Sequence, residues 1–141
     1  MLRFAMMVLV LLPIAAWAKD DLTGTWNVTI RPRADRNTCD KVPKVEAHQW
    51  LLAQNGDKIT VQVTGSPLFS RLQGTIQERQ VLLEGWTSGP GIDGLHTTAV
   101  YRLTASKGSL SGEFLYLGTK KRGYGSKSMC ITEYEVVAKQ P

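Results

Sequence analysis

The sequence predicts an all-β protein, an eight-stranded antiparallel up-and-down β-barrel closed by one disulfide. Three observations lead to this fold class. Apolar and polar residues alternate along most of the chain after the first 18 residues, helical periodicity is scarce there, and the two cysteines stand far apart. Tight turns and long connections also follow one another in alternation, as they do in a meander of antiparallel strands.

The first 18 residues predict a secretory signal peptide. Arg3 precedes the apolar run AMMVLVLLPIAAW, and Ala16 and Ala18 supply the small residues that signal peptidase recognises. This run is too short for a transmembrane segment, which needs about 20 apolar residues. We therefore expect cleavage after Ala18 and a single mature domain, residues 19–141, that is periplasmic or secreted.

Eight segments are expected to form the strands, in chain order. The second, VEAHQWLLAQ (45–54), is ambiguous as to which side chains face inward. The other seven alternate clearly: LTGTWNVTI (22–30), KITVQV (58–63), LQGTI (72–76), VLLEGW (81–86), LHTTAVYRL (95–103), LSGEFLYLG (110–118) and CITEYEVVA (130–138). The aromatic residues on their inward phases are Trp26, Tyr101, Phe114, Tyr116 and Tyr134. An eight-stranded barrel with this much aromatic volume is expected to be largely filled, so any pocket should be shallow and near the long-loop end.

The connections between these segments fall into two groups. QNGD (54–57), QERQ (77–80) and SKGS (106–109) are tight hairpin turns. RPRADRNTCDKVPK (31–44), the region around GSPLFS (65–70), TSGPGIDG (87–94) and GTKKRGYGSK (118–127) are long. Because alternate loops of a meander lie at the same end, tight turns should close one end of the barrel and long loops should ring the other.

Cys39 and Cys130 are expected to form the disulfide, since two lone cysteines in an oxidising compartment pair most simply with each other. Cys39 lies in the loop after the first strand, and Cys130 begins the last strand. The two thiols meet at one end if these strands are neighbours in a closed barrel. The crosslink would then stabilise the fold by roughly 4–5 kcal/mol. Neither cysteine has a second cysteine or histidine at metal-ligand spacing, so no metal and no cofactor are predicted.

The first strand carries a Gly-X-Trp motif, Gly24 and Trp26, and Leu-X-Gly recurs at Leu72-Gly74, Leu83-Gly85 and Leu110-Gly112. These features resemble the lipocalin and avidin group of barrels, and most of all the short lipocalin-like proteins that bacteria export. The resemblance implies that Trp26 is a structural plug at the closed end, with Gly24 allowing its close approach. Biotin binding is not supported, because Arg31 and Arg33 follow where avidins place small polar residues.

Basic residues concentrate in the first and last long loops. The formal charge is +5, or +4 once the leader with Arg3 is removed. The cluster comprises Arg31, Arg33, Arg36, Lys41, Lys44, Lys120, Lys121, Arg122 and Lys127, offset in part by Asp35 and Asp40. One interpretation is a rim that attracts anions, such as an anionic lipid, a polysaccharide or an acidic protein. The candidate ligand-binding residues are Arg31, Arg33, Arg36, Lys120, Lys121, Arg122 and Tyr124, whose ring lies between glycines and could stack on a ligand. The other interpretation is a solvated basic surface without a ligand.

No catalytic constellation is visible in the sequence, so an enzyme is not expected. His48 and His96 lie on separate strands, and Glu46 shares a strand face with His48, but no nucleophile is placed beside them. Nucleic acid is not expected as a partner in this compartment. The predicted function is that of an exported binding or interaction protein. The alternative is a secreted protease inhibitor of the eight-stranded barrel type, whose N-terminal segment Lys19–Asp21 would enter the protease.

Overall fold

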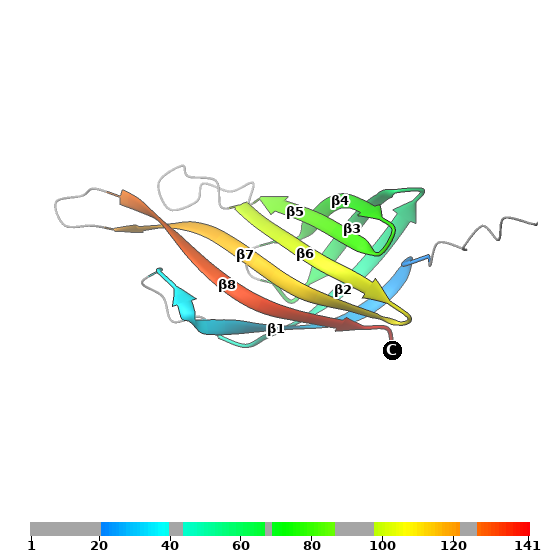
Figure 1. Cartoon of the computed structure of the whole chain (residues 1–141), viewed down its shortest axis with the longest axis horizontal. Helices are drawn as coiled ribbons and strands as arrows, with labels where there is room; N and C mark the ends of the chain where they lie inside the picture. The colour runs from blue at the N-terminus through cyan, green and yellow to red at the C-terminus, as the bar shows by residue number, and fades with distance from the viewer. Residues whose placement is uncertain (1–20, 40–43, 67–68, 87–97, 122–126) are drawn as a thin grey trace, which may run out of the picture.

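Eight strands pair in chain order and close into an antiparallel barrel, which confirms the predicted fold class. The computed structural model describes residues 21–39, 44–66, 69–86, 98–121 and 127–141, and within these ranges every element is a strand (Figure 1). The strands are β1 (Gly24–Asn37), β2 (Glu46–Asn55), β3 (Lys58–Thr64), β4 (Arg71–Gln77), β5 (Gln80–Trp86), β6 (Thr98–Ser106), β7 (Ser109–Lys121) and β8 (Lys127–Lys139).

Closure depends on β1, which pairs with β2 on one side and with β8 on the other. Val28 lies opposite His48 of β2 and opposite Ala138 of β8. Pairing on both sides leaves no free edge along this part of the wall, and free edges are what expose a sheet to aggregation. The predicted disulfide between Cys39 and Cys130 is confirmed, with the two Cα atoms 5.0 Å apart. It joins β8 to the segment that follows β1, at the long-loop end.

Two of the predicted long loops are shorter than expected, because strand pairing continues past the barrel proper. Arg31–Asn37 was expected as a loop, but it belongs to β1. The reason is that β8 offers a partner: Arg31 lies opposite Glu135, and the register shifts between Pro32 and Asn37. On the other side of β8 the pairing with β7 extends to Lys121 opposite Lys127. β7 and β8 therefore reach beyond the ends of β5 and β6 (Figure 1).

The core fills the interior of the barrel, and every strand contributes to it. The burial pattern of β2 resolves the phase that the sequence left ambiguous, since His48, Trp50 and Leu52 are buried and their neighbours are not. One buried side chain from each strand illustrates the composition: Trp26, Trp50, Ile59, Leu72, Leu83, Tyr101, Leu110 and Val136. The predicted inward aromatic residues are confirmed, with Tyr116 and Tyr134 only partly buried. Burial of apolar surface on this scale is the main term that stabilises the fold.

Two inward-facing glycines let the wall bend sharply. A Cβ atom on Gly74 would overlap the carbonyl oxygen of Leu82, and one on Gly112 would overlap that of Arg102. No side chain fits at either position without moving backbone. Two of the Leu-X-Gly repeats, Leu72-Gly74 and Leu110-Gly112, thus mark places where adjacent strands approach closely as the sheet curves into a barrel.

The tight-turn end is closed by the segment that enters β1. The indole Nε1–H of Trp26 donates a hydrogen bond of 2.9 Å to the carbonyl oxygen of Leu22. The backbone N–H of Leu22 in turn donates to the side-chain oxygen of Gln54 at 2.9 Å. Both Leu22 and Trp26 are buried. Gly24 between them has φ of +136°, a conformation that other residues rarely adopt.

Candidate functional site

The interior changes character towards the long-loop end of the barrel. There β2 begins with Glu46 and His48 on its inward phase, while β6, β7 and β8 contribute Tyr101, Tyr116 and Tyr134. We call these five residues the barrel mouth. The other described core residues are aliphatic apart from Trp26, Trp50, Phe69 and Phe114, so the barrel mouth is where polar atoms meet the core. Ligand sites commonly combine such an apolar surface with a few polar groups.

A stack of aromatic rings forms one wall of the barrel mouth. The rings of Tyr101 and Phe114 are nearly parallel, with centroids 4.3 Å apart and an interplanar angle of 4°. Phe114 stacks in turn on Tyr134 at 5.0 Å and 18°. The stack follows from register, because Tyr101 lies opposite Phe114 and Phe114 lies opposite Tyr134 on three consecutive strands. Tyr134 ends the stack and is half-buried, so the stack leads from the core towards solvent.

The facing strand, β2, supplies an acid and a base in contact. Nε2 of His48 lies 2.7 Å from a carboxylate oxygen of Glu46. The His48 side chain is only 2% exposed, whereas that of Glu46 keeps 32% of its surface in solvent. Residues two apart on a strand point the same way, and this places both side chains inward. The Glu46 carboxylate is thus held by the buried His48 and remains partly exposed to solvent.

Two nitrogen atoms in this region are buried without a hydrogen-bond partner, namely Nδ1 of His48 and the indole Nε1 of Trp50. Both residues lie on the inward face of β2, and Trp50 also contacts Tyr101 edge-to-face, with centroids 5.2 Å apart. Buried polar atoms without partners are uncommon in folded proteins and call for a specific explanation. At a site that binds a polar molecule, such atoms can hydrogen-bond the ligand.

The pKa values of the two tyrosines of the stack are shifted in the same direction by the same causes. Burial raises the pKa of the Tyr101 phenol well above its usual value, and the negative charge of Glu46 adds to the effect. Burial also raises the pKa of Tyr134, again with a contribution from Glu46. A carboxylate disfavours a second negative charge nearby, so it acts on phenols that face it. The register agrees with this influence, because Glu46 lies opposite Ile30 of β1, and Ile30 lies opposite Val136, two residues from Tyr134 on β8.

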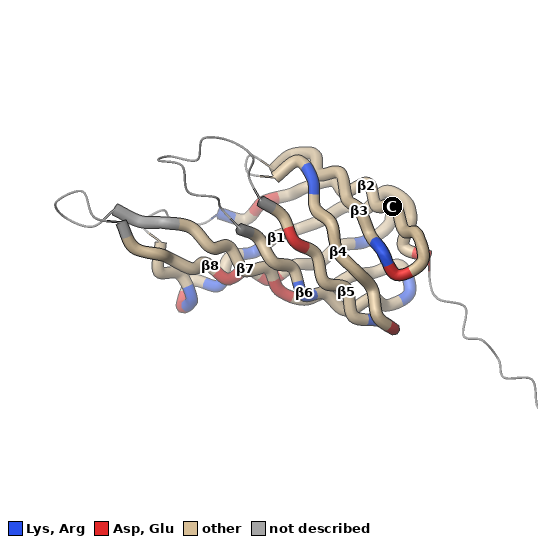
Figure 2. The backbone as a smooth tube through the Cα atoms, turned by 90° about the horizontal axis from the view of Figure 1, so that it is seen from above, with Lys and Arg blue, Asp and Glu red and all other residues tan. Residues whose placement is uncertain are grey.

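The basic residues singled out from the sequence are only partly brought together. Arg31 and Arg33 are exposed on β1, in strand rather than in a loop. Arg36 forms an ion pair of 3.3 Å with Glu133 of β8. Blue basic positions and red acidic positions are interspersed along the described backbone (Figure 2), so the described strands carry residues of both charges.

The rest of the predicted basic rim lies only in part within the described residues. Lys120 and Lys121 end β7, where their backbones pair with Ser128 and Lys127. Arg122 and Tyr124 lie outside the described residues, as do His96 and the predicted signal peptide. The predicted rim therefore stays a prediction. The same holds for the inhibitor alternative, since Lys19 and Asp20 also lie outside the described ranges.

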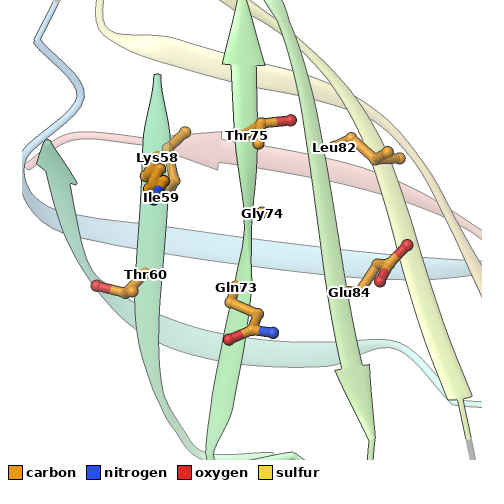
Figure 3. A pocket seen from close by; sticks show the side chains of 8 residues that line it. All are labelled: Lys58, Ile59, Thr60, Gln73, Gly74, Thr75, Leu82 and Glu84. Carbon is orange, nitrogen blue, oxygen red and sulfur yellow. The ribbon is translucent and has the colours of Figure 1, made fainter. Parts of the chain in front are cut away.

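A shallow groove of about 400 Å³ crosses the outer face of β3, β4 and β5 (Figure 3). Its lining combines Lys58, Thr60, Gln73, Thr75, Leu82 and Glu84 with the backbone around Ile59 and Gly74. These side chains are exposed and point away from the core. The groove is open and has no buried polar group, so it serves below as a control surface rather than as a site.

The sequence contains a signal for the barrel mouth in the phase of one strand. The sequence places Glu46 and His48 on one strand face, but it does not show whether that face points into the barrel. If Trp50 and Leu52 had been assigned inward, the same phase would have carried Glu46 and His48 into the barrel. The missing information was the phase of β2, which its mixed apolar pattern did not fix.

Comparison with known proteins identifies no relative: no protein-family model matches the chain, and no curated protein matches it. Within the described ranges, no three residues of the histidine, cysteine, aspartate and glutamate types gather as metal ligands. Nor does any helix of that part of the chain have the length and apolar character needed to cross a membrane. Any functional conclusion therefore depends on the geometry of the site itself.

Proposed function

We propose that this protein binds a small organic molecule at the barrel mouth. The observation that carries the proposal is an inward-facing carboxylate, Glu46, that is one-third exposed at the same end of the barrel as Tyr134, the half-buried end of a stack of aromatic rings. At the opposite end Leu22 and Trp26 are buried, which favours entry from the long-loop end. Rings offer apolar contact, and Glu46 offers hydrogen bonds that fix the orientation of a ligand.

The chemistry of the residues favours binding over catalysis. In the described part of the chain, His48 hydrogen-bonds Glu46, and its second nitrogen contacts no serine or cysteine that it could activate. A general base needs a group within hydrogen-bond reach from which it takes a proton. Glu46 and His48 lie two residues apart on one strand and hydrogen-bond each other. This arrangement suits a fixed recognition surface.

The test is an NMR titration of the ¹⁵N-labelled protein with 2-phenylethanol, phenethylamine and 3-phenylpropionate, three aromatic probes that differ in charge. At least one probe should shift, in a saturable manner, the backbone amides of Glu46, His48 and Tyr134. The amides of Gln73 and Glu84, in the outer groove of β3–β5, should not move. Saturable shifts confined to that groove, or no saturable shift with any probe, would overturn the proposal.

A second candidate function concerns the outer face of β1. Arg31 and Arg33 are exposed there, and within the described residues neither forms an ion pair with an acidic side chain. Such a pair of charges raises the local concentration of anions. We propose that this face contacts an anionic lipid surface, consistent with the basic cluster of the sequence. The double substitution R31A/R33A should then reduce sedimentation of the protein with phosphatidylglycerol vesicles. The control R79A, in the β4–β5 turn, should not reduce it. Equal sedimentation of both variants and the wild type would refute this contact.

Export to the periplasm or the medium belongs to the same proposal. The disulfide Cys39–Cys130 suits an oxidising compartment, where such bonds form and persist. N-terminal sequencing of the protein purified from its native host tests this point. A chain that begins at Lys19 supports cleavage of the predicted signal peptide, and a chain that retains Met1 contradicts it.

A further inference from the structure

We propose that the barrel mouth selects organic cations, with a ligand nitrogen bound at Glu46 and the body of the ligand against Tyr134 and Tyr116. This inference rests on the proposed function and adds the charge class of the ligand. It follows from three features of the site: the charge that Glu46 retains, the rings that surround it, and the position of the basic residues.

The contact with His48 leaves Glu46 its negative charge. A neutral imidazole protonated on Nε2 donates to the carboxylate and keeps Nδ1 as an acceptor, and Nδ1 has no partner. A doubly protonated ring would instead bury a charged N–H without an acceptor. An unsatisfied buried donor of a charged group is the costlier arrangement, so the proposal assigns His48 the neutral tautomer on hydrogen-bonding grounds. The pair as a whole then carries a single negative charge.

The exposed part of that carboxylate has room for a further donor. Its 2.7 Å contact with His48 uses one oxygen, and an ionised carboxylate can accept several hydrogen bonds. In the described residues, Glu46 forms no ion pair with a lysine or arginine. A ligand ammonium or guanidinium group would supply the missing cation.

The surrounding rings favour the same charge. Tyr116 and Tyr134 are half-buried, and Phe114 packs behind Tyr134. The faces of aromatic rings carry negative electrostatic potential and attract cations, more strongly where water is excluded. A neutral ligand would gain the apolar contact without this attraction, and an anion would be repelled by Glu46.

The basic side chains that the structure describes near the long-loop end are exposed to solvent. Arg31 and Arg33 are exposed on β1, and Arg31 lies opposite Glu135 of β8. Lys44, two residues before Glu46, is also exposed. Solvent and salt screen such exposed charges over about 8–10 Å, whereas Glu46 acts on its ligand at contact distance. The outer surface and the lumen can therefore favour ligands of opposite charge.

The test compares phenethylamine, 2-phenylethanol and 3-phenylpropionate, which share a phenyl ring on a short chain and differ in charge. Isothermal titration calorimetry is run on the wild type, on E46Q, and on E84Q as a control for loss of a carboxylate in the outer groove. Phenethylamine should bind the wild type at least about ten-fold more tightly than the alcohol, as expected for a charged contact. E46Q should abolish this difference, and E84Q should leave it unchanged. The amide oxygen introduced by E46Q can still accept a hydrogen bond from Nε2 of His48, so the fold should persist, and thermal melting checks this.

The outcomes separate the two proposals. If 2-phenylethanol binds the wild type as tightly as phenethylamine, or if E46Q keeps the preference for the amine, the charge assignment is wrong while ligand binding at the barrel mouth stands. If none of the three probes binds the wild type, both proposals fail. Tighter binding of 3-phenylpropionate than of the amine would also overturn the assignment.

Discussion

Replacement of Phe114 is expected to be among the most damaging single changes in the barrel wall. Phe114 is only 5% exposed and contacts three other rings: Tyr101 at 4.3 Å, Tyr134 at 5.0 Å and Phe69 at 6.3 Å between centroids. Truncation of a buried phenylalanine to alanine costs about 3–5 kcal/mol, and each aromatic pair adds about 0.5–1.5 kcal/mol beyond burial alone. We expect F114A to lower the free energy of unfolding by about 4 kcal/mol, since the cavity estimate already contains part of the ring contacts.

Leucine at the same position separates volume from stacking. F114L keeps most of the buried apolar volume but loses the parallel faces towards Tyr101 and Tyr134, so it should cost about 1–3 kcal/mol. Urea denaturation measures both variants, and with a slope of about 2 kcal/mol per molar, F114A should shift the midpoint by about 2 M. The control is L82A on the outer face, where Leu82 is 42% exposed, and it should cost less than about 1 kcal/mol. If F114A costs less than about 1 kcal/mol, or if F114L is as damaging as F114A, the ring stack does not stabilise the wall as its geometry implies.

Three further predictions concern the wall, the crosslink and the phenols. G112A should destabilise the barrel by several kcal/mol, because its Cβ atom overlaps the carbonyl oxygen of Arg102. G108A, at a position with φ of +68° and open space around the added Cβ atom, should cost about 1–2 kcal/mol. Similar melting temperatures of the two variants by circular dichroism would contradict this prediction. Reduction of the disulfide, which links residues 91 apart, should lower stability in urea by up to about 4–5 kcal/mol, and an unchanged midpoint with reductant would refute the estimate. The raised pKa of Tyr101 and of Tyr134 means that the unfolded chain loses its phenol protons first. Stability should therefore fall as pH rises above about 10, by up to about 1.4 kcal/mol per pH unit for the buried Tyr101 and by less for the half-exposed Tyr134. Y101F should reduce that slope in urea titrations at increasing pH, and a slope that Y101F leaves unchanged would contradict the assignment.

The sequence predicted the architecture of the barrel more completely than it predicted the candidate site. Strand alternation and turn chemistry together predicted eight strands, their order and the inward aromatic residues, because burial on one face forces a two-residue period. The position of Cys39 relative to Cys130 predicted the closure. Strand ends were less predictable, since the continuation of β1 through Arg31 and Pro32 depends on the partner that β8 supplies. No local pattern marks those residues as extended.

The candidate site escaped prediction because it depends on distances across the lumen. Glu46 and His48 are adjacent on one face of β2, but the rings that face them come from β6, β7 and β8. Only the closed barrel brings Tyr101 and Tyr134 opposite Glu46, and only burial distinguishes His48 from a surface histidine. The basic cluster, by contrast, was conspicuous in sequence, yet Arg36 is paired with Glu133 in the fold. Local charge was thus a weaker guide than the inward phase of a single strand.

The central claim, a ligand site at the barrel mouth centred on Glu46, is tested most directly by a crystal structure of the protein soaked with phenethylamine. The account predicts the amine nitrogen within about 3.2 Å of a Glu46 carboxylate oxygen, with the phenyl ring against Tyr134 or Tyr116. Phenethylamine bound instead in the outer groove beside Gln73 and Glu84, with the barrel mouth unchanged, would contradict it.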